Sequence, residues 1–141
     1  LEGINALLKR KILKLISRYK QPIVIQKYLK EIKEGDRRII LIDGEYVGSV
    51  ARIPKKGSVT ANFHTGGSAK KVGLVRRDKK ICSILKPFLK KKKLFFTGID
   101  VIGNYLTEIN VTSPTGIQEI NKLNRVKLEE FFWDRVEKKL R

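Results

Sequence analysis

Oxygen-bearing side chains lie inside a segment rich in β-branched residues, residues 98–114, and this segment constrains the fold more than any other part of the chain. Glu108 and Asn110 are two residues apart, so on an extended strand they project from the same face. Asp100 lies on the preceding strand of the same expected hairpin. Carboxylate and amide oxygens are ligands of hard cations such as Mg²⁺, which binds few carboxylates and keeps water or phosphate oxygens as its other ligands. The pattern therefore predicts a metal site on one face of a hairpin.

The turn of this hairpin decides whether Asp100 joins the other two ligands. A three-residue turn at Gly103-Asn104-Tyr105 would pair Asp100 with Glu108 on one face. A two-residue turn at Gly103-Asn104 would pair Asp100 with Thr107 instead and leave Glu108 on the opposite face. The metal hypothesis thus predicts the three-residue turn. The alternative is an ordinary hairpin whose polar residues form a solvated edge.

The composition is that of one folded domain, because 141 residues with 41% hydrophobic and 33% charged content can bury a core. The only cysteine, Cys82, has no internal disulfide partner and is expected to be a small buried hydrophobe. No apolar run reaches the roughly 18 residues of a membrane span, so we expect no membrane contact and a cytoplasmic location. Since the chain begins with Leu1 and contains no Met, we expect it to be a piece of a longer protein.

A net charge of +18 favours anionic partners. Two observations argue against nucleic acid: the lysines are spread over the expected helix faces, and the aromatic residues do not form a stacking platform. Phosphate-bearing small molecules are the favoured partners, and a basic nucleic-acid-binding module remains the alternative. His64 has no second His or Cys nearby and receives no role.

The clearest local signal is a hairpin of residues 39–42 and 46–51 joined by Asp43-Gly44, since Asp-Gly supplies the positive φ of a type I′ turn. Apolar spacing predicts the other elements. They are a helix over 4–19, a buried strand over 23–26, a helix that Asp78 caps and Pro87 kinks or breaks, a second hairpin of 94–102 and 106–111, and helices over 117–123 and 126–140. The sum is an α+β fold, with a mainly antiparallel sheet of about five strands and helices packed on one face.

Residues 53–71 form a Gly-, Thr- and Asn-rich connector with little periodic apolar signal. A connector of this length in a compact domain more often marks a mobile lid over a binding site than idle linkage. We therefore expect a lid, with a disordered insertion as the alternative.

Seven short strings occur along the chain in the following order: Gln26-Lys-Tyr-Leu29, Gly35-Asp-Arg-Arg38, Asp43-Gly-Glu45, Ala51-Arg-Ile-Pro54, Gly66-Gly67, Gly98-Ile-Asp100 and Thr107-Glu-Ile-Asn-Val-Thr-Ser-Pro114. Together they resemble the C-terminal half of the ATP-grasp domain of bacterial glutathione synthetase. The likeness runs from about residue 22 to about residue 124, and the Glu-Ile-Asn-Val-Thr-Ser-Pro and Ala-Arg-Ile-Pro strings are its most specific parts.

The resemblance implies an ATP-dependent carbon-nitrogen ligase that joins γ-glutamylcysteine to glycine through an acyl phosphate, with Mg²⁺ (or Mn²⁺) as cofactor and ATP as co-substrate. Asp100, Glu108 and Asn110 match the metal ligands of the family. Arg38 and Arg52 match its catalytic arginines, which contact the transferred phosphate and the peptide carboxylate. No protein nucleophile is required by this chemistry.

The resemblance also implies a nucleotide site and a lid. The stretch 53–68 matches the mobile loop that closes over the substrate, although Thr60 and Ser68 stand where relatives often have Arg. Asp36 lies near the nucleotide in relatives. The connector against the adenine edge is matched by Gln26, Lys27, Tyr28 and Leu29.

Residues 1–141 would then be a partial ATP-grasp domain, whose N-terminal substrate domain and first half are expected elsewhere. We expect such a chain to bind ATP weakly alone, without turnover, and the complete enzyme to be a homo-oligomer. The alternatives within this resemblance are another ATP-grasp amino-acid ligase, one subunit of a split gene and a decayed remnant.

Overall fold

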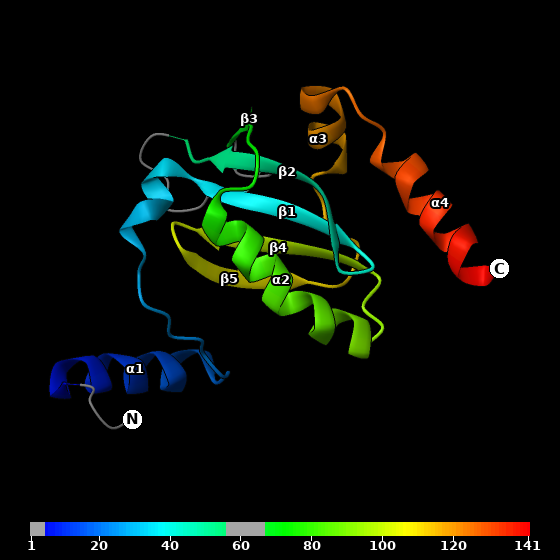
Figure 1. The fold of residues 1–141 in the computed structure, drawn as a ribbon. Coiled ribbons are helices and arrows are strands. Elements are labelled where there is room, and N and C mark those ends of the chain that lie inside the picture. Colours follow the sequence, from blue (N-terminus) through cyan, green and yellow to red (C-terminus); the bar gives the residue numbers. More distant parts are fainter. Residues whose placement is uncertain (1–4, 56–66) are drawn as a thin grey trace.

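The centre of the fold is a five-stranded antiparallel sheet, seen in a computed structural model that describes residues 5–55 and 67–141 (Figure 1). The spatial order of the strands is β3-β2-β1-β4-β5. In chain order the strands are β1 (Asp36–Ile42), β2 (Glu45–Ile53), β3 (Ser68–Lys71), β4 (Phe96–Ile102) and β5 (Tyr105–Asn110). The predicted α+β class with a five-stranded sheet is confirmed.

Helices lie on both faces of this sheet rather than on one. In Figure 1, α2 crosses the near face of the sheet, α4 lies to the right of the sheet, and α1 stands apart at the end of an extended segment. Buried residues of α3 and α4 pack with Ile40, which points to the face opposite α2. The helices are α1 (Ala6–Tyr19), the short 3-10 helix η1 (Lys30–Glu34), α2 (Arg76–Lys91), α3 (Ile117–Asn124) and α4 (Leu128–Leu140). The part of the prediction that placed all helices against a single face is therefore wrong.

The central strand β1 explains this two-sided arrangement. Its residues 39–42 are fully buried, and successive side chains of a strand point to opposite faces. Ile39 and Leu41 pack in one core with residues of α2, and Ile40 packs in a second core with residues of α3 and α4. A continuous apolar run is typical of a strand covered on both faces. The first core also contains Ile81, Cys82, Leu89, Ile99 and Val101, and the second contains Val50, Ile120 and Leu128.

The first hairpin has the predicted turn. Asp43 and Gly44 have φ values of 52° and 74°, the positive values that both central residues of a type I′ turn require. Ile42 pairs with Glu45 directly across the turn. Asp36 and Arg52 are paired at the other end of this hairpin, away from the turn.

The strand predicted over residues 23–26 is not formed. Residues 22–29 are extended but unpaired within the described ranges, and Val24 and Ile25 are 85% and 51% exposed. Ile23 and Val24 line a small apolar hollow together with Ile12 and Leu15 of α1. A β-branched run becomes a strand only where a sheet edge accepts it, and here the segment lies against a helix instead.

Helix α2 has the cap predicted at Asp78, whose carboxylate accepts the backbone N–H of Val75 at 3.2 Å from inside the first turn. The helix continues past Pro87, which excludes a break there, one of the two outcomes predicted for that residue. Cys82 is buried as predicted, and burial raises the pKa of its thiol to about 11.

The ends of the predicted lid are strands. Ile53 ends β2, and Ser68 begins β3, which pairs with β2. Reading residues 68–71 as loop was therefore wrong. The middle of the predicted lid, residues 56–66 with Thr60, lies outside the described residues.

Candidate functional site

Asp100 faces Glu108 across the β4–β5 hairpin, as the metal hypothesis requires, but by a different route from the one predicted. The turn is the two-residue Gly103-Asn104, since Ile102 pairs with Tyr105, so the predicted three-residue turn is wrong. A register shift next to Asp100 inserts one extra residue into β5 and restores the pairing of Asp100 with Glu108. Such an insertion is a β-bulge.

Two aspartates and two arginines form a buried cluster beside this hairpin. Arg38 and Asp100 are register partners on β1 and β4, and Asp36 and Arg52 are partners on β1 and β2. Arg38 binds Asp100 through two nitrogens, with Nη2 2.9 Å from Oδ2. Arg52 binds both oxygens of Asp36, with Nε 2.7 Å from Oδ1, and its Nη2 lies 2.8 Å from Asp100 Oδ2. Asp100 thus joins the two arginines into one network.

Burial and charge set the protonation of the two aspartates in opposite directions. All four side chains are between 4% and 8% exposed. Burial raises the pKa of Asp36 above its ordinary value in spite of its bonds to Arg52. Burial also opposes ionisation of Asp100, but the hydrogen bonds and positive charges of Arg38 and Arg52 together outweigh it and lower the pKa of Asp100. For Arg52, burial is likewise outweighed by the two carboxylates, which raise its pKa. Asp100 is the more firmly ionised of the two acids.

Arg38 also fixes the loop that follows β5. Its Nη1 donates to the backbone carbonyl of Thr115 at 3.0 Å. A Cβ added to Gly98 would lie 2.6 Å from the Pro114 side chain, and one added to Gly116 would lie 3.2 Å from Arg38 Cγ. The absence of side chains at both glycines therefore lets the loop close over the Arg38 stem.

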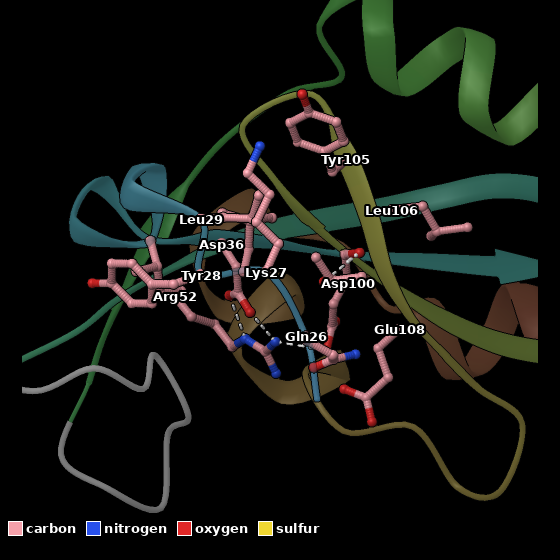
Figure 2. A pocket seen from close by; sticks show the side chains of 13 residues that line it. Gln26, Lys27, Tyr28, Leu29, Asp36, Arg52, Asp100, Tyr105, Leu106 and Glu108 are labelled. Atoms are coloured by element: carbon pink, nitrogen blue, oxygen red, sulfur yellow. Dashed lines mark hydrogen bonds and ion pairs between the residues drawn. The ribbon is translucent and has the colours of Figure 1, made fainter. Parts of the chain in front are cut away.

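An open cavity of about 820 Å³ lies over this end of the sheet. Figure 2 shows Asp36, Arg52 and Asp100 together in it, with Glu108 projecting from β5. Eight of the ten predicted site residues line the cavity, namely Gln26, Lys27, Tyr28, Leu29, Asp36, Arg52, Asp100 and Glu108. The other two, Arg38 and Asn110, are not among its lining residues.

Sequence reasoning missed five residues of this lining, which are Ile32, Ile102, Tyr105, Leu106 and Thr107. Tyr105 and Leu106 line the cavity as the first two residues of β5, which begins directly after the two-residue turn. Nothing in their residue types marks them as site residues.

The oxygen donors of the hairpin fit a hard divalent cation. Glu108 is exposed and makes no hydrogen bond or ion pair within the described ranges. The amide Nδ2 of Asn110 is buried without a partner there, and a half-turn of the amide would present its oxygen at the same place. Asp100, Glu108 and Asn110 lie on one face, since Asn110 pairs with Gly98 two residues before Asp100. The described part of the chain contains no group of three or more His, Cys, Asp or Glu residues that could hold a metal ion.

Comparison with known proteins identifies the family. The family model for the prokaryotic glutathione synthetase ATP-grasp domain matches residues 5–125. The chain belongs to this ATP-grasp family. The predicted family membership is therefore confirmed.

Individual relatives agree with the family match. The glutathione synthetase of Mesorhizobium japonicum is 46% identical over 121 residues, which are 86% of this chain and 39% of the relative. The glutathione synthetase of Synechocystis sp. is 50% identical over 111 residues, 79% of this chain and 35% of the relative. That of Brucella melitensis is 46% identical over 119 residues, 84% of this chain and 38% of the relative. The ATP-grasp chain described here thus spans little more than a third of the relatives' length.

The described ranges of this ATP-grasp chain contain no helix with the length and apolar character needed to cross a membrane.

Proposed function

We propose that this chain is the metal-binding and nucleotide-binding part of an ATP-dependent ligase that forms glutathione from γ-glutamylcysteine and glycine. The observation that carries the proposal is the pairing of Asp100 with Glu108 at a cavity that also contains Arg52, in a chain of the prokaryotic glutathione synthetase family.

Asp100, Glu108 and Asn110 would hold Mg²⁺ or Mn²⁺ in this proposal. The bound ion would offset the negative charge that gathers on the ATP phosphates during transfer. Glu108 is available as it stands, because it makes no hydrogen bond or ion pair within the described residues. Asn110 would become available through a half-turn of its amide, whose buried nitrogen has no partner in the same residues. Asp100 would share its oxygens between the ion and the arginines.

The arginines and the connector would bind the rest of the nucleotide and the substrate. The planar guanidinium groups of Arg38 and Arg52 bind two oxygens at once, which suits a phosphate or a carboxylate. The connector Gln26–Leu29 would lie against the adenine, since these residues line the same cavity as Asp36 and Asp100.

The proposed reaction has two steps and needs no protein nucleophile. A carboxylate oxygen of γ-glutamylcysteine attacks the γ-phosphorus of ATP, the bond to the β-phosphate oxygen breaks, and an acyl phosphate and ADP result. The amine of glycine then attacks the acyl carbon, inorganic phosphate leaves, and the amine loses a proton. A cytoplasmic location belongs to the proposal, because a reducing compartment keeps the substrate thiol free.

We further propose that the 141-residue chain binds ATP weakly alone and does not turn over, because the matched relatives are more than twice as long. A single-turnover assay in which the chain alone converts γ-glutamylcysteine and glycine to glutathione would refute this part. Homo-oligomer formation by the complete enzyme stays a prediction.

Isothermal titration of the chain with ATP, in Mg²⁺ and in EDTA, tests the nucleotide and metal roles. We expect binding that depends on Mg²⁺ and that Glu108→Ala abolishes. Glu45→Ala is the matched control, because it removes the same charge from a strand at the opposite end of the sheet. ATP binding of equal affinity in Mg²⁺ and in EDTA would contradict the proposal. Binding to DNA or RNA that falls steeply with salt and survives Glu108→Ala would favour the nucleic-acid alternative.

A further inference from the structure

The two-residue turn of the β4–β5 hairpin would by itself place Glu108 on the wrong face. Starting from the turn, Ile102 pairs with Tyr105 and Val101 pairs with Leu106. A regular hairpin would next pair Asp100 with Thr107, and Glu108 would then face the core under α2. Because Asp100 pairs with Glu108 instead, Thr107 is the extra residue of the bulge.

The turn does not absorb this extra residue, because two arginine side chains on the α2 side of the sheet bind the backbone carbonyls of the turn. Arg37 donates to the carbonyl of Gly103 at 2.7 Å, and Arg77 donates to the carbonyl of Asn104 at 2.9 Å. Arg37 is itself fixed by two bonds to the buried carboxylate of Asp78, at 2.8 and 2.9 Å. Both carbonyls of the turn are therefore anchored, and the irregularity lies inside the strand.

Hydrophobic burial favours the bulged register only weakly, through the pairing of Ile109 with the buried Ile99. β5 is an edge strand without a fully buried residue, and Ile109 is 36% exposed. Register is weakly specified where neither face of a strand is buried. A polar contact can therefore decide it.

That contact is made by the bulge residue itself. The Thr107 hydroxyl donates to the backbone carbonyl of Asp100 at 3.1 Å, in a half-buried position at the edge of the cavity. In the regular register Thr107 would pair directly with Asp100, and its hydroxyl would not be placed to make this bond. The hydroxyl thus stabilises the bulged register but not the regular one.

We propose that Thr107 is a positioning residue, which holds β5 in the register where Glu108 faces Asp100. This inference rests on the proposed function, because it matters only if that pair binds the metal. Thr107→Val removes the hydroxyl and keeps the shape, so the Mg²⁺-dependent affinity for ATP should fall by up to about fivefold, the effect of one ordinary hydrogen bond. Thr107→Ser should restore it. Thr112→Val, in the exposed loop after β5, is the matched control.

Deletion of Thr107 separates positioning from general stability. Without that residue the regular register pairs Asp100 with Glu108 directly, so the deletion variant should bind ATP with wild-type Mg²⁺ dependence. A residue needed only for stability would instead make the deletion more harmful than Thr107→Val. Circular dichroism establishes that each variant is folded.

Cross-strand nuclear Overhauser contacts between residues 100 and 108 give a second measurement, made without nucleotide or metal. We expect these contacts in the wild type, in Thr107→Ser and in the deletion variant, and weaker contacts in Thr107→Val. A Thr107→Val variant that matches the wild type in both measurements overturns this inference alone. A wild-type chain with the 100–108 contact but no Mg²⁺-dependent binding overturns the proposed function instead.

Discussion

Arg37 and Asp78 form an ion pair whose two partners should differ in how much stability is lost when each is removed. The Asp78 side chain is 0% exposed, whereas Arg37 is 18% exposed. Asp78 accepts two bonds from Arg37 and one from the backbone N–H of Val75, and Arg37 also donates to Gly103. Removing Arg37 leaves the Asp78 charge fully buried, whereas removing Asp78 leaves the Arg37 charge partly exposed to water. The free energy of unfolding should therefore fall more for Arg37→Ala than for Asp78→Ala.

Burial sets the size of the two effects. Arg37→Ala leaves a fully buried carboxylate with one weak donor, and breaking a buried pair in this way typically costs about 3–5 kcal/mol. Asp78→Ala leaves a guanidinium that reaches water and keeps its bond to Gly103, so the loss should be nearer to that of a charged hydrogen bond, about 1.5–3 kcal/mol. Replacing both residues by apolar ones, Arg37→Met with Asp78→Leu, removes both charges and should cost less than Arg37→Ala.

Urea unfolding followed by far-ultraviolet circular dichroism measures these differences. Fluorescence is a poorer probe, because the single tryptophan, Trp133, is 61% exposed. If Asp78→Ala destabilised the chain as much as Arg37→Ala, or if the apolar double variant were the least stable of the three, the reasoning from burial would be refuted.

Two further predictions concern Gly98 and Asp43. Gly98→Ala places a Cβ 2.6 Å from the Pro114 side chain and should cost about 1–3 kcal/mol in urea unfolding. Gly73→Ala, whose Cβ meets nothing within 4 Å, should change stability by less than about 0.5 kcal/mol, and equal losses would contradict the packing argument. A hydrogen bond from Lys139 lowers the pKa of Asp43 below its ordinary 3.8, so this carboxylate stabilises the fold above pH 3.8 and less as the pH falls further. Asp43→Asn keeps a residue that tolerates the positive φ and should lower the free energy of unfolding at pH 7 by at most about 1 kcal/mol. This difference from the wild type should disappear near pH 2 and should be smaller at high salt concentration. A difference that became larger at acidic pH would contradict the predicted direction.

Local signals in the sequence predicted the parts of the fold that local interactions determine. The Asp43-Gly44 turn is an example, because its positive φ values depend on those two residues alone. The two-sided burial of residues 39–42 had a local signal too, because four apolar residues without alternation favour a strand covered on both faces, but the prediction placed the helices on one face only.

Elements that depend on a partner were not predictable in this way. Residues 23–26 have the composition of a strand but find no sheet edge, whereas Ser68–Lys71 carry two lysines and become a strand because the edge of β2 is available. The bulge at Thr107 belongs to the same class, since the anchors of the turn come from Arg37 and Arg77, far away in sequence.

The candidate site was predictable mainly through the family resemblance. Spacing alone placed Glu108 and Asn110 on one face, but it left the position of Asp100 open between two turns. The resemblance supplied Asp36 and Arg52, which the structure brings together with Asp100 in one network. Neither the spacing nor the resemblance predicted Tyr105 and Leu106, because their position at the cavity depends on the three-dimensional path of the turn.

The network of Asp36, Arg38, Arg52 and Asp100 has two negative and two positive members, which sum to zero. A bare divalent ion arriving at Asp100 would meet a carboxylate whose charge the two guanidinium groups already balance, so the network would attract it only weakly. Anionic oxygens that arrive with the ion would change this balance, because each arginine would then bind phosphate oxygens as well as a carboxylate. We therefore expect Mg²⁺ and ATP to enter as a single complex, and free Mg²⁺ to saturate the chain poorly in the absence of nucleotide.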